Sequence, residues 1–105
     1  MALGPAAKYQ ERYDAKTVIA EGTTKLIQFV SNSNVLLIGS GKSSGSFLFL
    51  VRTAQNGGIG MAEVYKGTSI TWATVQGNQI TITNSTNADT EVYAIVLAGS
   101  VSFPS

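Results

Sequence analysis

The stretch Phe47-Leu48-Phe49-Leu50-Val51 consists of five apolar residues in unbroken succession, and Val35-Leu36-Leu37-Ile38 repeats the pattern nearby. Successive side chains of a β-strand point to opposite faces of its sheet, so a strand with one face in water should alternate apolar and polar residues. Both runs are too short for a helix and are flanked by Gly and Ser, which predicts strands buried on both faces. A chain of 105 residues offers one core. We therefore expect something outside the domain, such as another copy of the chain, to cover the second face.

Similar short β-patterns fill the chain from Lys16 onward. Asn56-Gly57 is a strong hairpin signal, and Ile80-Thr81-Ile82-Thr83 shows the clearest alternation of apolar and polar residues. Seven or eight short strands with turn residues between them are typical of an antiparallel β-sandwich. We predict an all-β sandwich over residues 16–105, either a jelly roll or another Greek-key arrangement. The expected strands cover residues 17–20, 23–30, 35–38, 47–53, 59–65, 69–75, 80–83 and 91–98.

Residues 1–15 are interpreted as an N-terminal arm. Seven of the 13 charged side chains of the protein lie in the first 25 residues. Lys8 and Arg12, like Tyr9 and Tyr13, are spaced i,i+4, which permits one or two helical turns. So short a helix is marginal alone, so we expect a solvated arm that packs on a neighbour or continues a preceding shaft.

The composition excludes several classes of function. Charged residues make up 12% of the chain and the net charge is +1, which argues against nucleic-acid binding through a basic field. The chain has neither cysteine nor histidine, so disulfides, thiolate metal sites and a histidine general base are excluded. No apolar run approaches the roughly 18 residues of a membrane helix. We expect no cofactor, no nucleic-acid partner and no insertion into a membrane.

Two glycine-containing motifs fail the tests of their structural context. Gly39-Ser40-Gly41-Lys42-Ser43 resembles the end of a phosphate-binding loop, but Leu36 occupies the required first glycine position and a strand follows instead of a helix. We interpret it as a flexible hairpin loop. Gly58-Ile59-Gly60 begins like a dinucleotide-binding fingerprint, but Glu63 stands at the third glycine position.

The carboxylates do not form a convincing site. Asp89 and Glu91 would share one face of a strand, as metal ligands do, yet two carboxylates at a strand entrance are better explained by solvation. Glu63 stands alone in an apolar strand and is expected to point outward or to pair with Lys66 or Arg52. The many Ser and Thr residues lack an activating base, so we predict neither catalytic nor metal-binding residues and a protein that is not an enzyme.

Trp72, the only tryptophan, is the single candidate ligand-binding residue. An exposed indole can stack on a sugar ring, whereas a buried indole that closes one end of the core is more common. Asn84-Ser85-Thr86 matches the glycosylation sequon, which has meaning only in a eukaryotic secretory pathway. The polar loops Ser31–Asn34, Gly39–Gly45 and Asn84–Ala88 are the other places where recognition could occur.

The segment from Gly77 to Gly99, with Ile-Thr-Ile-Thr-Asn followed by an apolar last strand, resembles the closing hairpin of small trimeric β-sandwich domains of tailed-phage fibres and other virion appendages. This resemblance implies a non-enzymatic structural module of the virion, of the tail-fibre, head-fibre or decoration type. It implies a homotrimer whose partners are other virion proteins and which could bind a host-surface glycan. Five residues of the two-sided strands are predicted to form the subunit interface: Val35, Leu37, Phe47, Phe49 and Val51.

The alternative is a monomeric carbohydrate-binding or adhesin module of a larger secreted or cell-surface protein. That hypothesis predicts an exposed Trp72 with Tyr65 or Tyr93 nearby. The two hypotheses differ in oligomeric state and in localisation, which is the virion for the first.

Overall fold

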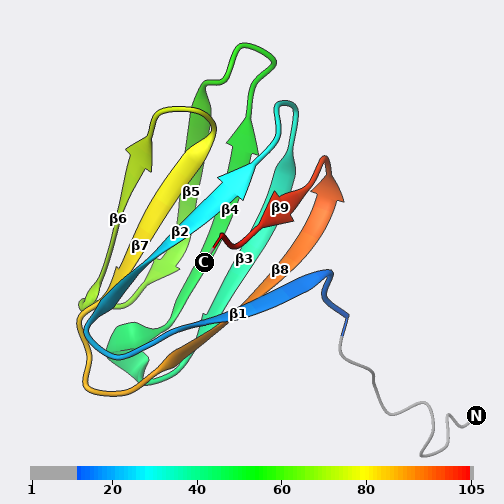
Figure 1. Cartoon of the computed structure of the whole chain (residues 1–105). Coiled ribbons are helices and arrows are strands. Elements are labelled where there is room, and N and C mark those ends of the chain that lie inside the picture. The colour runs from blue at the N-terminus through cyan, green and yellow to red at the C-terminus, as the bar shows by residue number, and fades with distance from the viewer. Residues whose placement is uncertain (1–11, 105) are drawn as a thin grey trace, which may run out of the picture.

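The structure, a computed structural model, describes residues 12–104 and shows two antiparallel β-sheets packed face to face (Figure 1). The five-stranded sheet has the order β1-β8-β3-β4-β5 and the four-stranded sheet the order β6-β7-β2-β9. The predicted all-β antiparallel sandwich is confirmed. The elements are β1 (Ala15–Ile19), β2 (Thr23–Phe29), β3 (Asn34–Ser40), the short 3-10 helix η2 (Ser43–Gly45), β4 (Phe47–Thr53), β5 (Ile59–Lys66), β6 (Ile70–Val75), β7 (Gln79–Asn84), β8 (Thr90–Ala98) and β9 (Val101–Ser102).

The connectivity is that of a Greek key. Strands β3, β4 and β5 follow one another in one sheet, the chain then forms the β6–β7 pair in the other sheet, and β8 returns to lie beside β3. The resulting order β8-β3-β4-β5 is the Greek-key order. Both predicted arrangements, a jelly roll and another Greek-key sandwich, contain this motif.

The core lies between the two sheets and is supplied by every second residue of their strands. Phe47 and Phe49 of β4 stack with their ring centroids 4.6 Å apart. The four-stranded sheet contributes residues such as Ile27 of β2 and Ile82 of β7. The buried hydrophobic residues are Ile19, Ile27, Phe29, Val35, Leu37, Phe47, Phe49, Val51, Ile70, Ile80, Ile82, Val92 and Ala94, each at most 2% exposed.

This core corrects the predicted subunit interface. The five residues named for it, Val35, Leu37, Phe47, Phe49 and Val51, are 0–2% exposed within a single chain. They pack against the other sheet of their own chain, so they are not on a surface that a second subunit could contact. The prediction named two strands that do have an outer apolar face, but it selected the side chains that face the core instead of those that face outward.

The described boundaries agree with the prediction to within a few residues at each strand. Strand β1 begins at Ala15, so the sandwich starts one residue before the predicted boundary at Lys16. The segment after Ser100, for which no strand was predicted, contributes the two-residue β9 beside β2. The predicted helical turns fall mainly on residues outside the described range, and residues 12–14 are not helical.

The segment from Gly77 to Gly99 does not form a hairpin. Strand β7 pairs with β6 and β2, whereas β8 pairs with β1 and β3 in the opposite sheet. The chain crosses between the sheets in a loop organised by Asn84, which is fully buried. Its Nδ2 donates to the carbonyls of Ile19 (3.0 Å) and Ala88 (2.9 Å), and its Oδ1 accepts from the backbone N–H and the hydroxyl of Thr86.

Candidate interaction surface

The outer face of the five-stranded sheet is apolar across its centre. In β3 and β4 the buried residues alternate with partly exposed ones, so Leu36, Ile38, Leu48 and Leu50 point away from the core. Strand β8 behaves in the same way, with Val92 and Ala94 buried and Ile95 partly exposed. A sheet in contact with water on this face would carry polar residues at these positions.

The strand register arranges these side chains in two neighbouring rows that cross the sheet. One row contains Tyr93, Ile38, Leu48 and Tyr65, and the next contains Ile95, Leu36, Leu50 and Ala62. We call these eight residues the apolar band. Cross-strand neighbours on one face lie close enough to touch, so the band is one continuous surface.

Polar residues border the apolar band at both ends of the strands. Asn34 and Arg52 are paired beyond Leu36 and Leu50. At the other end, Ser40 is paired with Glu91. An apolar centre with a polar rim is the usual anatomy of a protein–protein interface.

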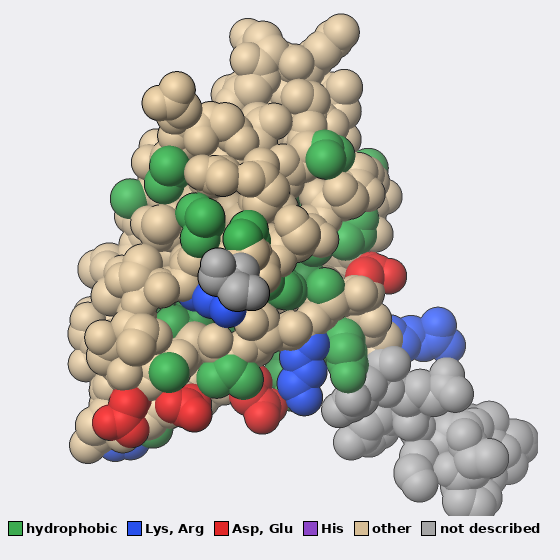
Figure 2. All heavy atoms as spheres, viewed as in Figure 1, with side chains coloured by type: hydrophobic (Ala, Val, Ile, Leu, Met, Phe, Trp, Pro, Cys, Tyr) green, Lys and Arg blue, Asp and Glu red, His purple; other side chains and the backbone are tan. Residues whose placement is uncertain are grey.

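The outer face of the four-stranded sheet has a different composition. Its outward-facing positions include Thr24, Thr81 and Thr83, and the hydroxyls of Thr24 and Thr83 are 2.7 Å apart. Gln79 donates to the side-chain oxygen of Gln28 (2.6 Å) on the same face. Leu26 and Ala73 are opposite Thr81 on the same face. Figure 2 views the molecule from this side and shows hydrophobic side chains among the polar ones. This face is therefore mixed, and more polar than the outer face of the five-stranded sheet.

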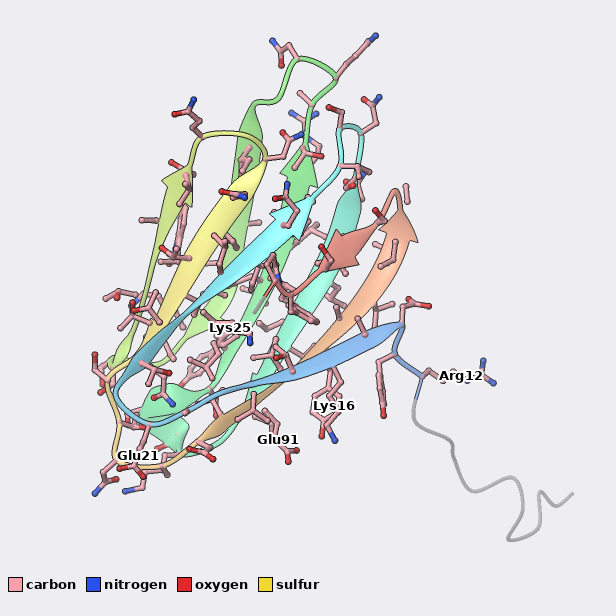
Figure 3. The ribbon with its side chains drawn as sticks, viewed as in Figure 1. Arg12, Lys16, Glu21, Lys25 and Glu91 are labelled. Carbon is pink, nitrogen blue, oxygen red and sulfur yellow. The ribbon has the colours of Figure 1, made fainter. Side chains whose placement is uncertain are left out.

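Tyr93 is held in place at one edge of the apolar band. The ring of Tyr13 meets it edge-on at a centroid distance of 5.2 Å, and the Lys16 ammonium lies 5.2 Å from the centre of the Tyr93 ring. The Tyr93 hydroxyl donates to Glu91 (2.6 Å). Lys16 and Glu91 extend from neighbouring strands β1 and β8 toward the same side of the molecule (Figure 3). These contacts fix the ring as part of the surface.

Trp72, the predicted ligand-binding residue, packs against the core at the edge of the sandwich. It belongs to β6, and its indole N–H donates to the Glu63 carboxylate of β5 (2.5 Å). The bond therefore connects the edge strands of the two sheets. Glu63 is expected from the sequence to point outward or to pair with Lys66 or Arg52. Its side chain is exposed, and its described hydrogen bond is the one from Trp72. Glu63 continues the inward alternation of Met61, because it is opposite the inward-facing Phe49. The bulge follows Glu63 and places Tyr65 on the outer face, opposite Leu48.

Asp89 and Glu91 have separate structural roles. Asp89 accepts a hydrogen bond from the Glu21 backbone N–H (3.0 Å), whereas Glu91 accepts the bond from Tyr93. Carboxylates lie along one end of the molecule (Figure 2). Within residues 12–104, no group of three His, Cys, Asp or Glu side chains could hold a metal ion. The same residues contain no helix of the length and apolar character needed to span a membrane.

The predicted recognition loops are tied to the sandwich. In Gly39–Gly45, the carbonyl of Ser44 accepts from the Ser69 N–H (2.9 Å), and the carbonyl of Gly45 accepts from the buried Thr90 hydroxyl (2.8 Å). These bonds hold a loop that the sequence predicted to be flexible. In Ser31–Asn34, the hydroxyl of Ser33 donates to the carbonyl of Val30 (2.7 Å). Asn84 of the sequon is buried, and its side-chain amide is engaged in hydrogen bonds. The amide is therefore inaccessible in the folded protein.

Comparison of the chain with protein-family models, with curated proteins and with solved structures gives no match. The class of the protein is therefore defined by its fold and its surface: an antiparallel β-sandwich with one apolar outer face and one that is more polar. The sequence pattern predicts the two-sided strands correctly, but the outward-facing residues were not among the predicted interface residues. One signal could have found them, since Arg52 at the strand end shares the face of Leu48 and Leu50 by simple alternation.

Proposed function

We propose that this protein is a non-enzymatic structural module that assembles as a homotrimer through the apolar band. One observation supports this proposal most directly. On the outer face of the five-stranded sheet, Leu36, Ile38, Leu48 and Leu50 lie side by side in neighbouring strands. Exposed apolar patches of this kind mark interaction surfaces. Each square ångström of apolar surface removed from water contributes about 25 cal/mol to association.

The size of the face supports a permanent contact. Five strands about 4.8 Å apart, each about seven residues long at about 3.3 Å per residue, give a footprint of roughly 500 Å² per copy. Faces of this size buried against one another reach the roughly 1,000 Å² in total that separates biological interfaces from incidental ones. The absence of histidine and cysteine from the sequence supports a role without catalysis.

The setting proposed for this module is a virion appendage, such as a tail fibre, a head fibre or a decoration. Support for this setting comes only from the sequence pattern of Gly77–Gly99, whose two strands resemble those of virion sandwich domains but lie in opposite sheets and not in one hairpin. Support for the assembly comes from the apolar band. Other virion proteins are the proposed partners. A contribution to the recognition of a host-surface glycan would fall to the loops at the ends of the sandwich, since the apolar band is covered in the trimer.

Light scattering behind a sizing column tests the assembly on the intact chain. One chain has a mass of 11.0 kDa, and the proposal predicts a stable species of three times that mass. A species with the mass of one chain across the range of protein concentrations would contradict it. That result would favour the alternative, a monomeric carbohydrate-binding or adhesin module.

A further inference from the structure

The outer face of the five-stranded sheet has a depression near one edge. The depression has a volume of about 240 Å³ and is lined by Arg12 and Tyr13, which precede β1, by Ile38 of β3, and by Tyr93 and Ile95 of β8. Its walls are apolar and aromatic, and the edge-to-face contact of Tyr13 with Tyr93 fixes one side. Arg12, the one charged residue of the lining, is exposed (Figure 3).

The opposite edge of the same face has a projection. The bulge in β5 places Val64 and Tyr65 opposite the single residue Leu48. Val64 is 65% exposed and Tyr65 is 51% exposed, both high values for large hydrophobic residues. The hydroxyl of Tyr65 donates to the carbonyl of Ser43 (3.1 Å), so the ring has a fixed position. The projection is therefore preformed.

The symmetry of a trimer relates these two features. In a ring of three copies every contact is heterologous, so one part of the surface meets a different part of the next copy. Strand β3 is the middle strand of the sheet. If three such faces surround an axis parallel to the strands, β3 with Leu36 and Ile38 lies nearest the axis. The β4–β5 half of each face then meets the β1–β8 half of the next.

We propose that the β5 bulge of one copy, Val64 with Tyr65, occupies the depression of the next copy and closes a ring of three. This inference rests on the self-association proposed above and names the residues that make the contact. The projection and the depression are complementary in chemistry, since both are apolar and aromatic. The exposed ring of Tyr65 meets a site lined by Arg12, and a guanidinium over an aromatic face is an attractive pair.

Pairs of engineered thiols test this contact directly, because the natural chain has no cysteine. Val64→Cys is combined with Ile95→Cys in one chain, and the purified protein is treated with a short bis-maleimide crosslinker. We expect a covalent trimer from the double variant and no crosslinked species from either single variant. Val64→Cys with Tyr13→Cys provides a second pair, should Ile95→Cys disturb the sheet.

The matched control combines Val64→Cys with Thr81→Cys, which places the second thiol on the outer face of the four-stranded sheet. No covalent trimer is expected from it. A covalent dimer from Val64→Cys alone would show a twofold contact and overturn the inference. A protein of trimeric mass that gives no crosslink with either test pair would overturn the proposed contact but not the proposed trimer. A monomeric mass would contradict both the contact and the trimer.

Discussion

The two sheets of this protein present opposite outer faces on a common core. The four-stranded sheet is apolar inside and mixed but mainly polar outside: in β7, Ile80 and Ile82 are buried while Thr81 and Thr83 face outward. The five-stranded sheet is apolar on both sides, with Phe49 buried and Leu50 facing outward one residue later. The difference teaches that the chain uses one sheet to close its own core and the other to build a second apolar surface.

Interior residues of the two sheets should have equal importance, because they share one core. We predict that Phe49→Ala lowers the free energy of unfolding by about 3–5 kcal/mol and Ile82→Ala by about 2–5 kcal/mol. Chemical denaturation measures both, with Thr81→Ala on the polar face as the control, where a change below about 0.5 kcal/mol is expected. If Phe49→Ala cost no more than this control, the inward assignment of the Phe49 side chain would be wrong.

Asn84 is the last of the inward-facing residues of β7, after Ile80 and Ile82. Its replacement should have the next largest effect on the free energy of unfolding. Asn84→Ala removes the buried amide that donates to the Ile19 carbonyl and one of the two donors to the Ala88 carbonyl, which also accepts from the Thr86 hydroxyl. We expect a loss of about 2–3 kcal/mol in unfolding free energy, since an unsatisfied buried group costs about 1–3 kcal/mol. Asn87→Ala is the matched control, because that exposed amide contacts only the Lys42 side chain in the described hydrogen bonds. Equal effects of the two substitutions would contradict the structural role of Asn84.

The contact between Trp72 and Glu63 joins the edges of the two sheets, and its removal should be the smallest effect. Trp72→Phe removes the indole donor, and we expect a loss of about 1 kcal/mol in unfolding free energy. Glu63→Gln retains an acceptor oxygen at the same place and should cost less. The same denaturation series measures both variants. A larger loss for Glu63→Gln than for Trp72→Phe would mean that the carboxylate acts through another contact.

The sequence predicted the positions of the strands well, but it predicted only in part which side chains of each strand point to the core. Alternation in Ile80–Thr83 orients β7 correctly, because only one of its faces is apolar. In Phe47–Val51 both faces are apolar, so the pattern fits either orientation, and the five core residues were assigned to a subunit interface. The orientation of Tyr65 could not be predicted either, because the bulge after Glu63 shifts the alternation by one residue without a signal in composition.

Long-range contacts account for the remaining differences. The loop around Gly41 and Gly45 looks free in the sequence, but Thr90, which is distant along the chain, packs against both glycines. Gly77–Gly99 suggests a hairpin because two β-patterns flank a polar loop. The buried Asn84 amide instead turns the chain into the opposite sheet. Neither contact follows from local propensity, since both depend on residues distant in the sequence.

The measurement that tests the central claim most directly is the solution mass of two matched lysine variants. Leu50→Lys places a charge in the apolar band, and Thr81→Lys places the same charge on the polar face of the other sheet. Light scattering should give one chain, 11.0 kDa, for Leu50→Lys and three chains for Thr81→Lys, with circular dichroism confirming that both are folded. A trimer that survives Leu50→Lys, or dissociates equally with Thr81→Lys, would contradict the assignment of the apolar band as the assembly surface.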